Sequence, residues 1–357
     1  MATDAGIERL VAPESPGAEG WDDFVQLVAV RNECVRLGER RDRENTAEFL
    51  FARWHEPGQT PPLWLVARDL GRIVGYGQYS INTPDLDPVG YPNVMVLPDH
   101  RGRGIGTALA TQIEAIAAAD ARRTLIVEFA SPPVSGPQLS APDGSGEIPA
   151  GDPGVRFALA HGYSLGQVYR LSSCTLPLSA ERLDALEAAA RAKAGTEYRV
   201  HTWEGATPER WVDDLAALMT RMATDAPAGD IDWPEEPWDA QRIRDNEAMH
   251  AAAGTSRFVA AAEHIPTVRL VAFTDAEVRL GSPGSAQQQD TLVLIEHRGH
   301  SLGMLLKVAN LRALQSAHPE QRAILTENAS ENAHMLAINN ALGFETFVFT
   351  GVWQKSL

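Results

Sequence analysis

Residues 101–106 read RGRGIG, a segment whose residue types and spacing predict an anion-binding turn. Glycine lacks a Cβ, so the backbone can wrap closely around a phosphate. Successive N–H groups and the positive end of a helix dipole then point at the anion, and Arg101 and Arg103 add positive charge. The GK[ST] ending of a P-loop is missing, and the spacing is not GxGxxG. An arginine- and glycine-rich turn before an ordinary helix is the alternative interpretation.

The second half of the chain repeats this turn as RGHSLG, residues 298–303. Ser301 stands where the first turn has glycine. Serine is small, and its hydroxyl group can donate to a phosphate. His297 and His300 flank the turn, and a histidine there could titrate, although a histidine that simply faces phosphate or solvent is the commoner case.

Both turns occupy the same place in a longer repeated pattern. GRIVGYGQYS, NVMVL and RTLIVEFA in the first half correspond to VRLVAFTDAEVRL, TLVLI and RAILTEN in the second. These short apolar runs predict strands, and apolar residues on one face predict helices over 105–117 and after Leu302. Each half therefore predicts strand, strand, basic turn, helix, strand, helix, Gly-aromatic turn and strand, and a repeat of this length indicates two domains.

Two segments that interrupt the repeated pattern predict the domain limits of the 357-residue chain. Residues 131–154 are rich in Pro, Gly and Ser and predict a long loop without regular structure, either a substrate lid or a disordered insertion. Residues 179–195 carry an apolar stripe and end at Gly195, which predicts a linking helix. We therefore expect domains at 1–178 and 197–357, joined by a linker helix at 179–196.

The pattern V-x-x-x-P-x-x-R-G-x-G-I-G resembles motif A of the GNAT N-acetyltransferase superfamily, whose core is [QR]-x-x-G-x-[GA]. Arg101, Gly104 and Gly106 match this core fully. Residues 332–344 resemble motif B of the same superfamily. The resemblance implies a fold of the α/β (α+β) class with a mixed sheet. It also implies that the chain consists of two tandem GNAT acyltransferase domains. The tandem layout is similar to that of the mycothiol synthase type.

Motif B departs from the family pattern in both halves. Asn339 stands where the family often has a tyrosine general acid, and asparagine cannot supply a proton. Ala158 stands at that place in the first half, where Gly151 replaces the expected asparagine. The first half therefore has the better phosphate turn and the second half the better motif B, which favours chemistry in the second domain.

The resemblance implies acetyl-CoA as cosubstrate and no metal. The turns would hold its pyrophosphate, the strand before each turn its pantetheine arm, and Asn332 the pantetheine region. The residues implied in cofactor binding are Met95, Val96, Leu97, Arg101, Gly102, Arg103, Gly104, Ile105, Gly106, Thr107, Leu294, Arg298, Gly299, His300, Ser301, Leu302, Gly303 and Asn332.

The resemblance also implies direct attack of an amine on the thioester, without a covalent enzyme intermediate. A carboxylate near the fourth and fifth strands of a domain would accept the ammonium proton. The candidates are Asp290, at the start of the fourth strand, and Glu327, at the end of the fifth, with Asp87 and Glu128 in the first domain. A solvated strand-end carboxylate is the alternative interpretation of each. Neither cysteine has the His/Asn arrangement of a nucleophile.

Residues 228–242 are the candidate acceptor site. Trp233 and Trp238 lie among five carboxylates there, and such a loop can hold an ammonium group by charge and cation–π contact. The alternative is an acidic, solvated loop whose tryptophans pack into the core.

The net charge of −16 disfavours nucleic acid and anionic lipid as partners and suits a cationic amine, although it also serves solubility alone. Cys34 and Cys174 form no CxxC pair, and no leader or membrane span is readable, so we expect a cytoplasmic protein that can form a homodimer. The leading prediction is a small-molecule N-acetyltransferase. Two alternatives stay open: a non-catalytic acetyl-CoA sensor and an acetyltransferase for protein lysines or N-termini.

Overall fold

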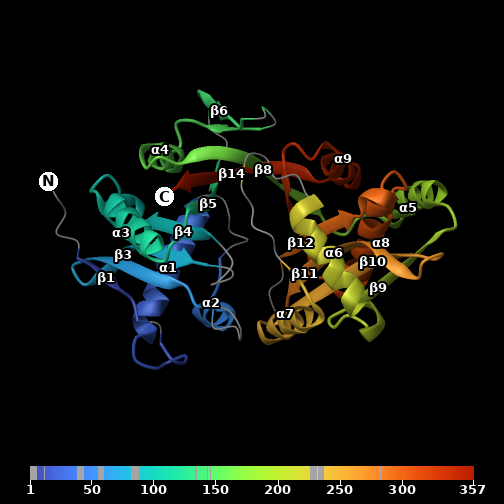
Figure 1. Ribbon diagram of the computed structural model, residues 1–357, viewed down its shortest axis with the longest axis horizontal. Helices are drawn as coiled ribbons and strands as arrows, with labels where there is room; N and C mark the ends of the chain where they lie inside the picture. The colour runs from blue at the N-terminus through green and yellow to red at the C-terminus, as the bar shows by residue number, and fades with distance from the viewer. Residues whose placement is uncertain are drawn as a thin grey trace. The chain divides into compact units, whose positions relative to one another are not determined.

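The computed structural model describes residues 6–11, 13–37, 44–54, 60–81, 88–132, 135–142, 144, 146–225, 231, 237–280 and 284–357. The chain forms two compact units (Figure 1). The first contains residues 1–168, 229–234 and 348–357, and the second contains residues 169–228 and 235–347. Among the described residues, no helix is long and apolar enough to cross a membrane.

The first unit is a mixed sheet with helices on both faces. The strands, in spatial order, are β1 (Ile7–Arg9), β2 (Leu63–Asp69), β3 (Arg72–Ser80), β4 (Val89–Val96), β5 (Thr124–Ser131) and β14 (Glu345–Ser356). Helix α3 (Ile105–Ala119) packs on one face through Ile105, Leu109 and Ile113, against β2 and β3. Helices α1 (Trp21–Leu37) and α2 (Ala47–Trp54) cover the other face, where Phe24 and Leu27 meet strand residues.

The second unit repeats this arrangement. Its strands, in spatial order, are β8 (Ser164–Thr175), β13 (Ala323–Ala329), β12 (Ser285–Val293), β11 (Arg269–Arg279), β10 (Thr255–His264) and β9 (Tyr198–Glu204). Helices α8 (Leu302–Ala317) and α5 (Ala180–Ala194) pack on one face, and α6 (Val212–Asp225) and α7 (Ala240–Ala252) pack on the other. Helix α9 (Ala333–Leu342) packs beside α8 through Met335 and Ile338.

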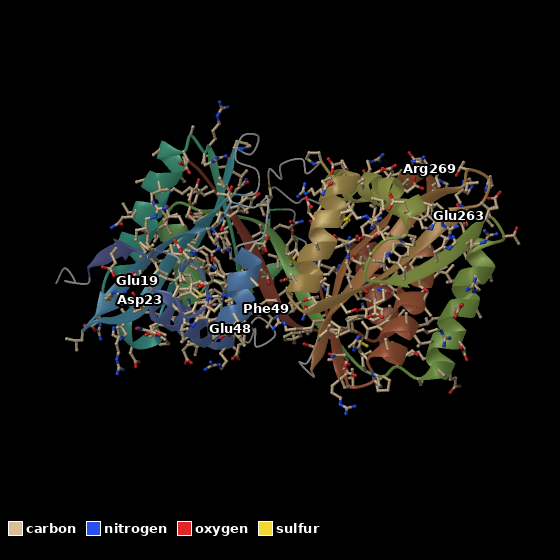
Figure 2. All side chains as sticks on the ribbon, turned by 90° about the horizontal axis from the view of Figure 1, so that it is seen from below. Glu19, Asp23, Glu48, Phe49, Glu263 and Arg269 are labelled. Atoms are coloured by element: carbon tan, nitrogen blue, oxygen red, sulfur yellow. The ribbon has the colours of Figure 1, made fainter. Side chains whose placement is uncertain are left out.

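Ion pairs fix the β10–β11 hairpin at the edge of the second unit. Figure 2 shows Glu263 and Arg269 close together there. Glu263 lies 2.7 Å from the Nε2 of His201 on β9, and Arg269 lies 2.7 Å from Asp214 on α6. The hydrogen bond from His201 lowers the pKa of Glu263, so this carboxyl group stays ionised.

Two strands pass from one compact unit into the other. Strand β8 begins in the first unit, and its residues 169–175 pair with β13 in the second. Strand β14 begins in the second unit, and its residues 349–356 pair with β5 in the first. The limits 1–178 and 197–357 stay a prediction. The linker helix is present as α5, whose buried Leu183 and Ala190 belong to the core of the second unit.

The expectation that residues 131–154 lack regular structure is wrong. Strands β6 (Gln138–Ser140) and β7 (Glu147–Pro149) form a short antiparallel hairpin, and helix α4 (Pro153–Ala160) begins inside the same range. Ile148 and Ala141 are buried in the core of the first unit. Two apolar side chains in a polar, proline-rich stretch are too few to produce a periodic signal, yet they fix the hairpin on the core.

Candidate functional site

The two glycine turns have the same backbone. Each follows a strand and a short 3₁₀ segment, η2 (Pro98–His100) or η4 (Ile295–His297), and Arg101 and Arg298 both have φ −70° and ψ 161°. The residue before the helix is left-handed in both turns, with φ 84° at Gly104 and 55° at Ser301. The repeat detected in the sequence therefore reproduces one local conformation twice.

The two arginines anchor their turns to the preceding strand. The Nε of Arg101 donates to the carbonyl oxygen of Val96 at 2.8 Å, and the Nε of Arg298 donates to Val293 at 3.1 Å. Arg103 donates to the carbonyl oxygen of Asp99 at 2.8 Å. These bonds hold the positive charges at the turn, while the first N–H groups of α3 and α8 have no intrahelical acceptor. This combination fits a diphosphate.

The glycines at the second helix positions serve close packing. A Cβ on Gly106 would lie 3.2 Å from the ring of Phe157 on α4, and a Cβ on Gly303 would lie 3.2 Å from Ile338 on α9. Each turn therefore lies directly against the helix that follows the fifth strand of its repeat.

Parallel strands separate beside each turn. The pairing of β4 with β5 covers Val89–Thr124 and Gly90–Leu125, and past these pairs the described partner of β4 is β3. The pairing of β12 with β13 runs from Ser285–Ala323 to Gln288–Thr326, and past Gln288 the described partner of β12 is β11. The backbone edges of Met95–Leu97 and Leu294 therefore lie at the end of a diverging strand pair.

A bulge in β12 carries Asp290. Thr274 pairs with Thr291 and Ala276 pairs with Gln288, so β12 contains one extra residue at this point. The N–H of Asp290 donates to the carboxylate of Asp275 at 3.0 Å. Asp275 is in turn paired with Arg257 at 2.8 Å, and both are buried. Bulges re-aim side chains and are frequent beside active sites.

The position of Asp290 differs from the prediction. Strand β12 begins at Ser285, so Asp290 lies in its second half and not at its start. The polar run SAQQQ carries no strand signal, and its strand conformation comes from pairing with β11 and β13. The sequence reading also missed Arg257 and Asp275, although a charged residue inside each of two apolar strands was a readable signal.

The other candidate carboxylates fall in different surroundings. Glu327 is half-buried on β13, one residue past the last pair with β12, and therefore lies near the bulge. Glu128 is exposed on β5 of the first unit, opposite Val352. Asp87 lies outside the described residues. The structure thus places Asp290 and Glu327 on neighbouring strands of one unit.

Trp238 is held by local contacts. The guanidinium group of Arg242 lies 4.1 Å from the centroid of its ring, and its backbone N–H donates to Thr220 at 2.9 Å. The half-buried ring packs against the core between α6, α7 and the sheet. Trp233 lies outside the described residues. The cation over the Trp238 ring in the structure is therefore Arg242.

Asn332 and Asn339 make intramolecular contacts. The Oδ1 of Asn332 accepts the N–H of Met335 at 3.1 Å, so Asn332 is the N-cap of α9. The Oδ1 of Asn339 accepts a hydrogen bond from the Nζ of Lys307 at 3.0 Å, and its Nδ2 donates to Asn328 at 2.6 Å. Lys307 was missed by the sequence reading, although it interrupts an apolar helix face.

Histidines and a tyrosine surround the second turn. Tyr198 Oη lies 3.0 Å from Nδ1 of His297, whose ring is 4.7 Å from that of His264, while the Tyr198 ring is 5.3 Å from that of His300. Burial and the neighbouring His264 lower the pKa of His297. His297 is thus neutral at physiological pH and adds no charge for a phosphate.

The thiols and the metal-ligating side chains are the remaining candidate groups. Burial raises the pKa of both Cys34 and Cys174, which keeps these thiols protonated and poor nucleophiles. Among the described residues, no group of three or more His, Cys, Asp or Glu side chains is placed to hold a metal ion.

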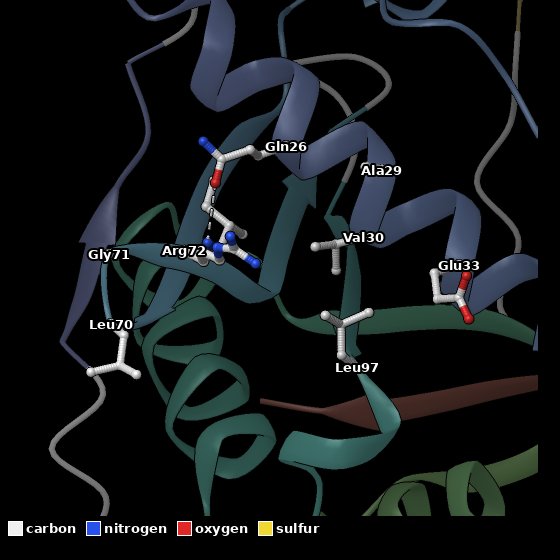
Figure 3. Close-up of a pocket in the computed structure, with 9 residues that line it drawn as sticks. Gln26, Ala29, Val30, Glu33, Leu70, Gly71, Arg72 and Leu97 are labelled. Carbon is white, nitrogen blue, oxygen red and sulfur yellow. Dashed lines mark hydrogen bonds between the residues drawn. The ribbon is translucent and has the colours of Figure 1, made fainter.

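A pocket of about 600 Å³ lies between α1 and the β2–β3 turn of the first unit (Figure 3). Val30 and Glu33 of α1 line it together with Arg72 and Leu97. Leu97 is the one predicted cofactor residue in its wall. The pocket therefore lies on the α1 side of the sheet, whereas α3 packs on the other face.

Comparisons with known proteins agree with this geometry. Residues 24–132 match the Acetyltransferase (GNAT) family. A search of curated proteins gives no match. A tandem GNAT protein from the clavulanic acid biosynthesis pathway is similar in structure, with 24% identity, a TM-score of 0.72 and 98% of each chain covered.

Two further solved structures share the fold. A GCN5-related N-acetyltransferase from Sphaerobacter thermophilus has 13% identity and a TM-score of 0.62, with 100% of this chain and 97% of that chain covered. A fungal multi-domain GH3 β-N-acetylglucosaminidase contains a glucosamine N-acetyltransferase region with 14% identity and a TM-score of 0.64. That match covers 99% of this chain and 38% of the fungal chain.

Proposed function

Because residues 24–132 match the GNAT acetyltransferase family and the chain has the tandem GNAT fold, we propose that it transfers an acetyl group from acetyl-CoA directly to the primary amine of a small molecule. We also propose that the second unit carries out the chemistry. The observation that supports this assignment is the β12 bulge, where buried Asp275 accepts the N–H of Asp290 on the strand that leads into the turn at 298–303.

In the proposed mechanism, the turn at 298–303 and the first N–H groups of α8 bind the pyrophosphate of acetyl-CoA. Asp290 accepts the proton of the acceptor ammonium group, directly or through water. The amine nitrogen forms a bond to the thioester carbon, the C–S bond breaks, and the sulfur leaves as a thiolate. A backbone N–H of the diverging strand polarises the carbonyl oxygen, and water returns a proton to the thiolate.

The charge of the protein supports a cationic acceptor. The net charge is −16, and Asp275, Glu277 and Asp290 lie around the buried Arg257, whose pKa each of them raises. A negative field raises the local concentration of ammonium substrates. Amino sugars therefore belong in a first acceptor panel, and the fungal protein of similar fold acts on glucosamine. The free thiols suit the reducing cytoplasm, which we include in the proposal.

The test is thiol release from acetyl-CoA with a panel of small amines and a lysine peptide. Arg298→Glu places a negative charge in the second turn and should abolish turnover, while Arg101→Glu should leave it largely intact. Arg322→Glu, an exposed arginine of the second unit, is the matched control. Loss of turnover only in Arg101→Glu would move the reaction to the first unit. Acetyl-CoA binding without turnover of any amine would indicate the sensor, and turnover of the peptide alone a protein acetyltransferase.

A further inference from the structure

Lys307 is a fully buried amine in the second unit. Its exposed fraction is 1%, and that of its partner Asn339 is 2%. The Nζ of Lys307 donates to Asn339, and Asn339 donates to the Oδ1 of Asn328 on β13. Asn328 is half-buried, so three side chains connect a buried amine to the surface of the sheet.

The first unit has apolar residues at the same three positions. Counting from the arginine of each turn, Lys307 corresponds to Ala110 of α3. Counting from the glycine that ends the last helix, Asn339 corresponds to Ala158 of α4. Phe129 of β5 corresponds to Asn328. Ala110 and Ala158 are buried, so the fold accommodates an apolar version of this site.

Burying an amine is unfavourable unless it is paired or hydrogen-bonded, and an apolar replacement is often neutral or stabilising. The apolar set of the first unit shows that the fold does not require the polar one. Buried polar residues that break the pattern of a core mark functional sites more often than stabilising ones. We therefore expect the Lys307–Asn339–Asn328 network to have a role other than stabilising the fold.

The network borders the candidate site at both ends. Lys307 lies one helical turn after Gly303 on α8, and Ile338, the neighbour of Asn339, contacts the Gly303 position. Asn328 lies two residues past Thr326, the last residue of β13 that pairs with β12. Asn328 therefore stands where the two parallel strands diverge, on the strand that also carries Glu327.

We propose that Lys307 is a positioning residue for acyl transfer in the second unit, acting through Asn339 and Asn328 on the departing thiolate of coenzyme A. This proposal rests on the proposed function. The Oδ1 of Asn328 accepts from Asn339 and from Thr326, so its Nδ2 is the group left to donate. When the C–S bond breaks and sulfur keeps the electron pair, this amide donates a hydrogen bond to the thiolate. A donor at the start of a hydrogen-bond chain polarises each amide along it, most strongly when the donor is a cation.

The surroundings of Lys307 allow both protonation states near neutral pH. Burial lowers the pKa of Lys307 to about 7, and the carboxylate of Asp275 on β11 opposes that shift. Asp275 is already paired with Arg257 of β10, and the other group near the amine is the ring of Phe344, 5.9 Å away. The ammonium form is therefore present at neutral pH. At higher pH the neutral amine keeps N–H groups that donate to Asn339, so the donor chain persists while the thiol titrates.

The test measures the thiol of bound coenzyme A. Coenzyme A is titrated with base on the Arg101→Glu protein, so that only the second unit binds it, and the thiolate is followed by its ultraviolet absorbance. We expect the bound thiol to ionise at lower pH than the free thiol. Lys307→Met should move ionisation back upward by about one pH unit, a tenfold smaller thiolate fraction at fixed pH. The exposed Lys193→Met is the matched control.

Three further results decide the proposal. Lys307→Met that binds coenzyme A with an unchanged thiol titration would overturn it while leaving the proposed function intact. Failure of the Arg101→Glu protein to bind coenzyme A would instead overturn the assignment of chemistry to the second unit, and this proposal with it. If Lys307→Met does not fold, the triple variant Lys307→Ala/Asn339→Ala/Asn328→Phe carries the apolar set of the first unit and must lose the same shift.

Discussion

Ser301 and Gly104 adopt the same left-handed backbone at the entrance to α8 and α3, with φ 55° and 84°. A left-handed conformation costs a residue with a side chain about 1–2 kcal/mol, whereas glycine adopts it freely. Ser301→Gly removes this cost. The glycine also raises the conformational entropy of the unfolded chain, which stabilises the unfolded state by about 0.4–1 kcal/mol. We expect a net gain of about 0.5–1 kcal/mol in the free energy of unfolding, measured by urea denaturation.

The matched control for this substitution is Gly104→Ser in the first unit, which should lower stability by a similar amount. A destabilised Ser301→Gly protein would show that the serine hydroxyl contributes a bond that outweighs its backbone cost.

The Arg257–Asp275 pair supports the β12 bulge rather than the stability of the core. Asp275→Asn removes the carboxylate that pairs directly with the buried Arg257 and should lower the free energy of unfolding by about 3–5 kcal/mol. The double variant Arg257→Met/Asp275→Leu removes both charges and should recover most of that loss. Its turnover should stay low, because Asp290 loses the acceptor for its N–H.

Recovery of both stability and turnover in the double variant would contradict this role. The measurements are urea denaturation and steady-state kinetics with the best acceptor of the panel.

Local features of the fold were predictable from the sequence. The turns at 101–106 and 298–303 depend on glycines, a 3₁₀ turn and the arginine beside them, all within nine consecutive residues. The GNAT fold and the enzyme class followed from these turns and are confirmed. Helix α3 begins at Ile105 as expected, since its apolar face repeats at helical spacing.

Features that depend on distant contacts were not predictable. Strand β12 begins in the polar run at Ser285 because β11 and β13 pair with it, and Lys307 meets Asn339 only when α8 packs against α9. The passage of β8 and β14 between the units likewise depends on pairings far apart in the chain. The candidate carboxylates and cofactor residues stay predictions.

Asn332 offers a way to separate helix capping from cofactor contact. Asn332→Ala removes the cap of α9 and should cost about 1 kcal/mol of stability. Asn332→Asp keeps an oxygen acceptor for the N–H of Met335 and should retain stability, as Asp152 does at the start of α4. If Asn332 also lies against acetyl-CoA, the added negative charge of Asn332→Asp should weaken binding of this anion, measured by calorimetry. Unchanged affinity in Asn332→Asp would restrict the residue to capping.

The general base is predicted to be Asp290. Asp290→Asn keeps the size of the side chain but removes its basicity, and should lower kcat/KM by about 10²–10⁴-fold. Glu327→Gln tests the candidate carboxylate on the neighbouring strand β13. The control is Glu128→Gln, at an exposed position of the first unit. A large loss in Glu327→Gln with normal turnover of Asp290→Asn would transfer the role to Glu327.

Lys307 should make the stability of the protein rise with pH above neutrality. Its pKa is about 7 in the fold and near 10.5 for an ordinary lysine, so between these values the unfolded chain binds more protons than the folded one. The free energy of unfolding therefore increases with pH across this window. From about pH 7 to about pH 9 we expect a gain of about 2 kcal/mol relative to Lys307→Met, which lacks the titrating group. Lys193→Met should keep the rise, and equal slopes in the wild type and Lys307→Met would show that the buried amine does not titrate in this range.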